Sequence, residues 1–331
     1  MTAPLRIGVW GVGLMGERHV RVLSSQPEVQ VVSIFDASSD RAQQVATRYG
    51  TQVAPSPEAL LAEVDAVSIA TPTPLHFVHV EQSLSLGKHV LVEKAITEQV
   101  DHAEVLTAMA RRTGKLLMVG HIERYNPVFS ELKRLIVEGG QRPFAIVFRR
   151  LSSFSTSSQA VDVVLDLMIH DVDLMLDLCR GMTVQHHDGI GRIVRTREID
   201  HGVAHFGFHG GPVVTLTASR VTEQKVRSIE VTTPSAFIVA DLLRKEIQSY
   251  RNTVSTYQAQ DGGVSYQQHT QIDQVQVPTA EPLLLEVQDF IRAIRTGQPP
   301  LVTAEDATEA LRLTQALRLQ MYAGLAQPSL R

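Results

Sequence analysis

A glycine-rich turn near the N-terminus constrains the fold of this chain more than any other feature. The stretch Ile7-Gly8-Val9-Trp10-Gly11-Val12-Gly13-Leu14-Met15-Gly16 places a Gly-x-Gly-x-x-Gly pattern directly after a short apolar run and at the start of a helical pattern. In such a turn the first glycine permits the bend, the second lets the backbone approach a pyrophosphate, and the third allows the helix to pack closely on the strand. The free N–H groups of the helix start favour bound phosphate. We therefore expect a dinucleotide to bind at Gly11, Val12, Gly13, Leu14, Met15 and Gly16.

A carboxylate follows this turn at the distance expected for a ribose-binding residue. Asp36 ends the second apolar run and lies 36 − 16 = 20 residues beyond Gly16, where such a side chain accepts hydrogen bonds from the adenosine ribose hydroxyls. Its charge would repel a ribose phosphate, so the sequence favours NAD over NADP. Arg41, one helical turn later, would partly offset that repulsion if its side chain swings toward the ribose. A solvated aspartate that binds no ligand is the alternative.

The N-terminal part of the chain has the pattern of a parallel sheet covered by helices, because short apolar runs alternate with segments of helical period. The expected strands are Leu5–Trp10, Val29–Phe35, Ala66–Ala70, His89–Val92 and Leu116–Gly120. The expected helices are Met15–Ser24, Ser39–Tyr49, Leu75–Leu86 and Glu98–Arg112. We expect an α/β protein in which residues 1–122 form an NAD-binding Rossmann domain.

The pattern changes after Pro127, where strand-type alternation becomes dominant. The expected strands are Ala145–Leu151, Ile190–Thr196, Val203–Phe208, Val213–Ser219, Val226–Thr232 and Phe237–Leu242, and the expected helices are a segment ending near Val137 followed by Val161–Leu178, Pro282–Arg295 and Ala304–Ala323. Successive strands with short turns predict a large, open, mainly antiparallel sheet. Because 331 residues suit two domains, residues 123–331 are expected to form an α+β domain for substrate binding and oligomerisation. Its C-terminal helix is free to pack back on the Rossmann domain.

Composition narrows the classes of partner. The net charge is −4 and the basic residues are scattered, so we expect no nucleic acid and no membrane surface as a partner, and a small molecule instead. The only cysteine, Cys179, lies in an apolar helical setting that suits a buried thiol better than a nucleophile. No signal peptide and no bilayer-spanning apolar run is recognisable, so a cytoplasmic location is expected.

Two loops at the ends of expected strands contain candidate residues for cofactor binding and proton transfer. In open α/β sheets ligands bind outside the carboxyl ends of the strands, which places Thr71, Pro72, Thr73 and His76 in one candidate cofactor loop and Glu93 and Lys94 in another. A lysine beside an oxidised nicotinamide ring feels a second positive charge and partial burial, so it can exchange a proton with a substrate hydroxyl. A surface lysine at a strand end is the alternative.

An acidic helix in the second half supplies a candidate base. Asp166, His170 and Asp173 recur at i, i+4 and i+7 of the expected helix and therefore share one face. A carboxylate one turn from an imidazole can fix its tautomer, so Asp166 and His170 are interpreted as orienting residue and base. A solvated helix face is one alternative. A metal site of two carboxylates and one histidine is formally another, although we expect no metal.

Taken in order and spacing, the glycine turn, Asp36, Glu93-Lys94 and the Asp166-x-x-x-His170 helix resemble the Gfo/Idh/MocA family of NAD(P)-dependent sugar and inositol oxidoreductases over essentially the whole chain. The resemblance implies that Lys94, Asp166 and His170 surround the carbon that exchanges a hydride with the nicotinamide. Ala95 stands where the family usually has proline, which removes one fixed φ next to Lys94.

Within that family, the segments at residues 119–127 and 166–173 are most similar to members that oxidise nucleotide sugars, in particular UDP-N-acetylglucosamine at C3. This implies a 3-keto product that feeds amino-sugar synthesis for lipid A or other glycoconjugates. Candidate substrate contacts are Glu123, Arg124, Asn126, Arg149 and Arg150, in addition to Lys94, Asp166 and His170. Guanidinium groups bind phosphate oxygens bidentately. A dehydrogenase of a free sugar, inositol or other polyol and a catalytically silent NAD(H)-sensing protein are the alternatives. A homo-oligomer, dimer or tetramer, is expected.

Overall fold

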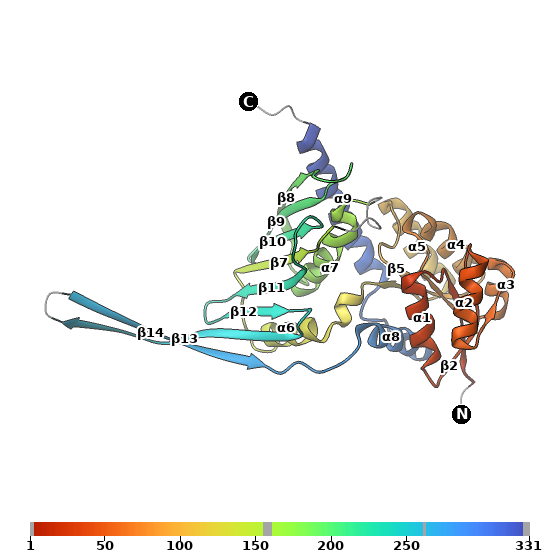
Figure 1. Ribbon diagram of the computed structural model, residues 1–331, viewed down its shortest axis with the longest axis horizontal. Helices are drawn as coiled ribbons and strands as arrows, with labels where there is room; N and C mark the ends of the chain where they lie inside the picture. Colours follow the sequence, from red (N-terminus) through yellow and green to blue (C-terminus); the bar gives the residue numbers. More distant parts are fainter. Residues whose placement is uncertain (1–2, 155–160, 261–262, 327–331) are drawn as a thin grey trace. The chain divides into compact units, whose positions relative to one another are not determined.

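The chain divides into two compact units (Figure 1). The computed structural model describes residues 3–154, 161–260 and 263–326. The first unit consists of Met1–Tyr125 and Ala280–Arg312, and the second of Asn126–Thr279 and Leu313–Arg331. The division therefore differs from a single boundary near residue 122, because a segment expected in the second domain returns to the first.

The first unit contains a six-stranded parallel sheet in the order β3-β2-β1-β4-β5-β6. Its strands are β1 (Leu5–Trp10), β2 (Val29–Phe35), β3 (Gln52–Val53), β4 (Ala66–Ile69), β5 (His89–Glu93) and β6 (Leu117–Gly120). The order reverses between β1 and β4, so the carboxyl ends of these strands flank the switch point where open α/β sheets bind ligands. The predicted Rossmann domain is confirmed.

Helices cover this sheet and begin and end at residues that suit helix termini. They are α1 (Leu14–Ser24), α2 (Ser39–Tyr49), α3 (Pro57–Glu63), α4 (His76–Ser85) and α5 (Val100–Thr113), joined later in the chain by α8 (Pro282–Thr296) and the first part of α9 (Ala304–Ala326). Ser38 caps α2 by accepting from the backbone N–H of Arg41, and Gly50 ends it in the left-handed region. The sequence did not predict β3 and α3, which have only two and seven residues.

The hydrophobic core of the first unit is completed by the returning segment. Leu283, Val287, Phe290 and Ile291 of α8 are buried in one cluster with the inner side chains of α1 and β1. Tyr125 adds a hydrogen bond of 2.7 Å from its hydroxyl to Asp289 of α8. The helix that follows the glycine turn therefore packs against residues about 270 positions later in the sequence.

The second unit contains an eight-stranded sheet in the order β14-β13-β12-β11-β7-β10-β9-β8. Its strands are β7 (Ala145–Leu151), β8 (Val184–Arg192), β9 (His201–Phe208), β10 (Val213–Ser219), β11 (Val226–Thr232), β12 (Phe237–Asp241), β13 (Glu246–Gln260) and β14 (Gly263–Val275). Only the β7–β10 pair is parallel among the strands of this sheet that the structure describes. The prediction of a mainly antiparallel sheet is confirmed.

Helices α6 (Pro127–Val137), α7 (Ile169–Leu178) and the second part of α9 belong to this unit. α9 approaches β8 and β9 closely, because a Cβ on Gly189 would lie 2.8 Å from Cε of Met321. Along β9, Ala204, Phe206 and Phe208 are buried whereas the alternate residues are exposed or half-buried. One face of the sheet is therefore covered and the other is open.

Two segments differ from the expected strands. The strand expected at Ile190–Thr196 ends at Arg192, because the N–H groups of Val194, Arg195 and Thr196 donate to the carboxylate of Asp200 instead of to a neighbouring strand. The long strands β13 and β14 were not predicted at all. Beyond Tyr250 β13 pairs with β14 alone in the register of the described strands, and in Figure 1 this ribbon extends past the other strands of its unit.

Candidate functional site

The three glycines of the turn differ in the space around them. Gly11 has a φ of +85°, and a Cβ there would lie 2.8 Å from Cγ2 of Thr71. A Cβ on Gly16 would lie 1.8 Å from the carbonyl oxygen of Gly11, whereas a Cβ on Gly13 would meet nothing within 4 Å. The fold itself thus requires Gly11 and Gly16, while Gly13 faces open space among the described residues.

The start of α1 is suited to bind phosphate. Gly13 is the N-cap residue, and no side chain of the described residues caps the helix, so the N–H groups of its first turn are available to a ligand. The open space over Gly13 lets a pyrophosphate approach that backbone. The chain therefore fits a dinucleotide at this turn, with the adenosine ribose toward the end of β2.

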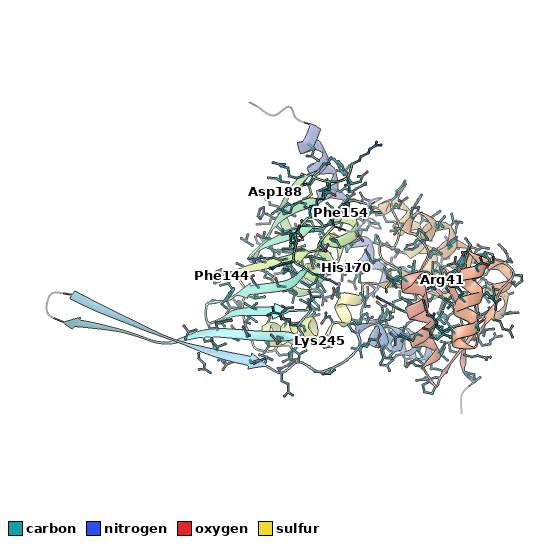
Figure 2. All side chains as sticks on the ribbon, viewed as in Figure 1. Arg41, Phe144, Phe154, His170, Asp188 and Lys245 are labelled. Carbon is teal, nitrogen blue, oxygen red and sulfur yellow. The ribbon has the colours of Figure 1, made fainter. Side chains whose placement is uncertain are left out.

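Asp36 holds the turn to the end of β2. Its Oδ2 accepts from the N–H of Val12 at 2.7 Å and its Oδ1 accepts from the N–H of Ser38 at 2.9 Å. Arg41, labelled in Figure 2, donates from Nε to the carbonyl oxygen of Val12 at 2.9 Å and forms an ion pair with Glu17 of α1. These contacts fix both polar groups of the Val12 peptide and lower the pKa of Glu17, mainly through the hydrogen bond from Arg41.

Two histidines of α4 hold the loop after β4. His76 is fully buried, and its Nδ1 and Nε2 lie 2.7 Å and 2.8 Å from the carbonyl oxygens of Ala95 and Thr71. Burial lowers the pKa of His76, so the neutral ring donates to one carbonyl at a time. Nδ1 of His79 lies 3.1 Å from Oγ1 of Thr71, and burial lowers the pKa of His79 to about 4. The predicted loop at Thr71, Pro72 and Thr73 is therefore tied to the loop that follows Lys94.

Lys94 directly follows the last residue of β5. Glu93 ends that strand, and its Oε1 lies 3.0 Å from Nε2 of the buried His19 on α1. Burial raises the pKa of Glu93, but the hydrogen bond from His19 and the nearby positive charge of Lys94 outweigh burial and leave the pKa below its usual value. The Lys94–Ala95 peptide bond is cis. Lys94 is thus placed by a buried carboxylate at the carboxyl end of the sheet.

In the second unit, Asp166 and His170 lie where the helix changes its winding. Val164–Met168 is a π-helical turn that continues into α7. Asp166 and His170 are half-buried, whereas Asp173 is fully buried. His170 is labelled in Figure 2. The π turn rotates the residues that follow it relative to a regular α-helix, and Asp173 is more deeply buried than Asp166 and His170. Asp162 caps the turn by accepting from the N–H groups of Val164 and Leu165.

The arginines and polar residues proposed for substrate binding have different surroundings. Arg150 is buried, and its guanidinium donates to both carboxylate oxygens of Asp171 at 2.7 to 3.0 Å. Arg149 is half exposed and lies 3.4 Å from Glu230. Asn126 caps α6 by accepting from the N–H of Val128. Arg124 is buried and Glu123 is half-buried in a short 3-10 helix at Ile122–Tyr125. Arg150 and Asn126 therefore make structural contacts within the second unit.

The structure adds residues that the sequence analysis missed. His19 and Ser68 form hydrogen bonds around Glu93, and His79 holds Thr71. Glu286 of α8 is fully buried, and both its oxygens have no hydrogen-bond partner among the described residues. His19 lies three residues after Gly16, and this position on the inner face of α1 is the one signal that could have been used.

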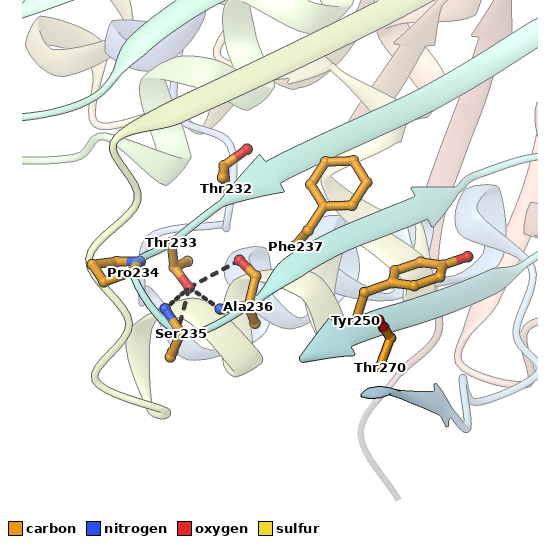
Figure 3. Close-up of a pocket in the computed structure, with 8 residues that line it drawn as sticks. All are labelled: Thr232, Thr233, Pro234, Ser235, Ala236, Phe237, Tyr250 and Thr270. Carbon is orange, nitrogen blue, oxygen red and sulfur yellow. Dashed lines mark hydrogen bonds between the residues drawn. The ribbon is translucent and has the colours of Figure 1, made fainter. Parts of the chain in front are cut away.

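A separate hollow lies in the second unit, beside the turn between β11 and β12 (Figure 3). It is bordered by Thr232, Ser235, Phe237, Tyr250 and Thr270, and none of the described residues lining it is titratable apart from Tyr250. Phe237 and Tyr250 pair across the strands with ring centroids 6.0 Å apart. The hollow lacks acid–base groups for the transfer of a proton, so it is not a candidate for the reaction site.

A Rossmann unit with a phosphate-binding turn, a strand-end carboxylate and a strand-end lysine, followed by an α+β unit, defines the class of nicotinamide-dependent oxidoreductases. Comparison with protein families agrees with this class. Residues 5–121 match the NAD-binding Rossmann fold of an oxidoreductase family, and residues 157–324 match the C-terminal alpha/beta domain of the same family. The chain belongs to the Gfo/Idh/MocA family of oxidoreductases, whose members act on CH–OH groups with NAD(P). The predicted family and cofactor are confirmed.

The similarity to individual relatives covers nearly the whole chain. UDP-N-acetylglucosamine 3-dehydrogenase from Acidithiobacillus ferrooxidans is 33% identical over 295 residues, which cover 89% of this chain and 90% of that protein. A solved structure of the same enzyme gives a TM-score of 0.89 at 30% identity and covers 98% of this chain and all of the other. The scyllo-inositol 2-dehydrogenase (NAD(+)) of Bacillus subtilis is 25% identical and covers 93% of this chain and 91% of that protein.

Among the residues that the structure describes, no helix is both long and apolar enough to span a bilayer. No group of three or more His, Cys, Asp or Glu side chains among them is arranged to hold a metal ion.

Proposed function

We propose that this protein oxidises a secondary hydroxyl of a nucleotide sugar with NAD, and that the substrate is UDP-N-acetylglucosamine, converted to its 3-keto form. The observation that carries this proposal is the 33% identity to a UDP-N-acetylglucosamine 3-dehydrogenase over nearly the full length of both chains. The product would feed amino-sugar synthesis for lipid A or other glycoconjugates. Such an enzyme would work in the cytoplasm, where the single buried thiol of Cys179 stays reduced.

The proposed chemistry assigns proton transfer to Lys94 and His170. One of them, in its neutral form, accepts the proton of the sugar hydroxyl, and Asp166 orients the imidazole of His170. NAD supplies the hydride acceptor, so the carbinol carbon loses a hydride and the hydroxyl a proton to give the ketone. A positive charge on Lys94 would stabilise the oxyanion that develops on the substrate. Glu123, Arg124 and Arg149 remain proposed contacts to the sugar or its diphosphate.

The cofactor contacts are proposed along the carboxyl ends of β1, β2, β4 and β5. The turn from Gly11 to Gly16 would bind the pyrophosphate, and Asp36 would accept hydrogen bonds from the adenosine ribose. Thr71, Pro72, Thr73, His76, Glu93 and Lys94 would line the path toward the nicotinamide. Because Arg41 is already paired with Glu17, the charge of Asp36 is expected to disfavour NADP.

The proposal is tested by following NADH absorbance with UDP-N-acetylglucosamine, other UDP-sugars and free polyols. Turnover of UDP-N-acetylglucosamine with a 3-keto product is expected. The Lys94→Met variant should lose turnover by at least about 10²-fold, since proton transfer contributes about 10² to 10⁴, while its affinity for NAD stays near the wild-type value. Wild-type turnover by this variant would remove Lys94 from its assigned role.

A second candidate is oxidation of inositol or another free polyol, which the relative from Bacillus subtilis favours. Calorimetry with UDP alone separates the two, because a free-polyol enzyme has no site for the nucleotide. Binding of NADH without turnover of any of these compounds, together with no effect of Lys94→Met, would instead indicate a silent NAD(H)-sensing protein.

We also propose a homo-oligomer that forms through the open face of the eight-stranded sheet. Val213 is 60% exposed and Ile190 is 59% exposed on its strands, and an open sheet face with exposed apolar residues offers a surface on which two subunits can pair. Light scattering coupled to size exclusion should give a mass of two or four chains. A monomer at micromolar concentration would refute this part of the proposal.

A further inference from the structure

We infer that His19 is a positioning residue for Lys94, which it holds through the carboxylate of Glu93. This inference rests on the proposed role of Lys94 in proton transfer. It assigns a function to a side chain of the pyrophosphate-binding helix that touches neither the turn nor the proposed substrate. Ser68, His19, Glu93 and Lys94 all belong to the first unit.

The contacts form a buried chain across three elements. Oγ of Ser68 on β4 lies 2.9 Å from Nδ1 of His19 on α1, and Nε2 of His19 lies 3.0 Å from Oε1 of Glu93 at the end of β5. His19 is 0% exposed and Ser68 is 1% exposed. Gly120 of the neighbouring strand β6 pairs with Glu93. A Cβ on Gly120 would lie 3.4 Å from Oε1 of Glu93, so the glycine leaves space for the carboxylate.

The donors and acceptors in this chain can all be satisfied by a neutral imidazole. The Glu93 carboxylate only accepts, so Nε2 of His19 must carry the hydrogen, and Nδ1 is then free to accept from the Ser68 hydroxyl. This arrangement holds the ring in one tautomer and one orientation. Serine, histidine and glutamate are also the groups of a hydrolase triad, but burial of both Ser68 and His19 leaves no path for a substrate to reach the hydroxyl.

Glu93 lies among several ionisable groups. His19 faces it from α1, His76 from α4, Lys94 from the next position of the chain and Glu286 from α8, where Asp289 is also near. Burial raises the pKa of Glu286 well above its usual value, and the charges of Glu93 and Asp289 raise it further. Glu93 is thus the carboxylate that directly precedes Lys94 in the chain, and His19 is a hydrogen-bond donor to it.

These contacts connect the proposed cofactor site to Lys94 through one helix, α1. The same helix that offers its N-terminus to the pyrophosphate also fixes, one turn later, the strand end that precedes Lys94. A lysine displaced by about 1 Å from the reacting hydroxyl can cost about 10²-fold in rate. His19 therefore contributes to turnover without contacting the reactants.

The test compares His19→Leu, which removes both hydrogen bonds, with His19→Gln, whose amide can still donate to Glu93. We expect kcat to fall by about 10²-fold in His19→Leu and by less than about 10-fold in His19→Gln, while the Kd for NAD changes by less than about threefold in both. His89→Gln is the matched control, because His89 is half-buried at the other end of β5 and accepts from the N–H of Leu116. This control should retain kcat.

A second readout does not depend on knowing the substrate. The rate at which an acylating reagent modifies Lys94 is measured by mass spectrometry as a function of pH in the NAD-bound protein. Without His19, the Glu93 carboxylate loses the hydrogen bond that holds it, so the reaction profile of Lys94 should differ from that of the wild type in His19→Leu. Ser68→Ala leaves the hydrogen bond between His19 and Glu93 in place, so it should change the reaction profile of Lys94 less than His19→Leu does.

The outcomes distinguish this inference from the proposed function. An unchanged kcat together with an unchanged Lys94 reaction profile in His19→Leu would overturn the inference. Full activity of Lys94→Met would overturn the proposed role of Lys94, while the reaction profile would still show whether His19 positions it. If His19→Leu fails to fold, His19→Gln and Ser68→Ala provide the same comparison with smaller changes.

Discussion

At the scale of single residues, Gly11, Gly13 and Gly16 differ in what requires the absence of a side chain. A side chain on Gly16 would collide with the carbonyl oxygen of Gly11, and Gly11 itself has a positive φ that favours glycine. Gly13 instead faces open space, which a bound ligand would fill. We predict that Gly13→Ala folds with a loss of no more than about 1 kcal/mol, the usual scale of an N-cap change, but binds NAD at least about 10-fold more weakly.

Gly16→Ala is the matched variant. It should lower the free energy of unfolding by more than about 2 kcal/mol, because the Gly11 backbone must move. Thermal unfolding and calorimetry with NAD measure both effects. Equal NAD affinity in Gly13→Ala and the wild type would show that the pyrophosphate does not lie over this turn.

Glu286 gives a pH-dependent prediction. Because burial raises its pKa in the folded state above about 4.3 in the unfolded chain, the unfolded state gains more from ionisation as pH rises. The contribution of Glu286 is therefore least unfavourable below about pH 4 and becomes more unfavourable as pH rises from there toward its folded pKa. Glu286→Gln should raise Tm more at pH 8 than at pH 5. The exposed Glu63→Gln should show the same small difference at both pH values, and a pH-independent gain in Glu286→Gln would contradict the prediction.

Residues whose chemistry depends on local sequence could be predicted, and those that depend on distant partners could not. The glycine turn, Asp36 and the strand-end position of Lys94 follow from spacing along a βαβ unit. The partners of His19 lie 49 and 74 residues away, and Arg150 pairs with Asp171 through the packing of β7 on α7. Neither pairing has a signature in a short stretch of sequence.

At the scale of elements, β7 presents two successive arginines to opposite faces of the sheet. Arg150 points to the covered face and is paired with Asp171, whereas Arg149 points to the open face. We predict that Arg150→Ala destabilises the protein by about 3–5 kcal/mol, because it removes a buried guanidinium that donates to both oxygens of a buried carboxylate. Arg149→Ala should change stability by less than about 1 kcal/mol.

Urea unfolding measures this difference. If the Arg150→Ala variant is instead stable but binds substrate more weakly, Arg150 is a substrate contact, as first expected from the sequence. Loss of substrate affinity in the stable Arg149→Ala variant would support its proposed contact with the nucleotide.

Elements with clear apolar periodicity were predicted within one or two residues, such as β1, β2, β7 and β10. The failures have physical causes. β8 is displaced because Asp200 takes the N–H groups that were assigned to a strand, and the β13–β14 ribbon is rich in Gln, Ser and Thr, so it lacks the apolar alternation that marks a half-buried strand. The π-helical turn at Val164–Met168 cannot be distinguished from an α-helix by sequence pattern.

At the scale of the whole molecule, the first unit is discontinuous in sequence. Leu283, Val287, Phe290, Ile291 and Val302 are all at most 4% exposed within its core. Burial of five such side chains contributes about 1.5–3 kcal/mol each, or roughly 7–15 kcal/mol, which equals the usual stability of a domain. We predict that residues 1–125 alone neither unfold cooperatively nor bind NAD.

Residues 1–125 joined to 280–312 by a flexible linker should regain both properties. Circular dichroism during heating and calorimetry with NAD test the two proteins side by side. Cooperative unfolding and wild-type NAD affinity of residues 1–125 alone would show that the returning segment is dispensable.

The returning segment also sets the order of events during synthesis. The core around the inner face of α1 is complete only when Val302 has been made, which is 302 − 125 = 177 residues after Tyr125. At about 5–20 residues per second, a ribosome needs roughly 10–40 s for that stretch. The part of the chain that leaves the ribosome first is therefore among the last to close its core, and in the interval its apolar helix face is exposed to chaperones and to neighbouring nascent chains.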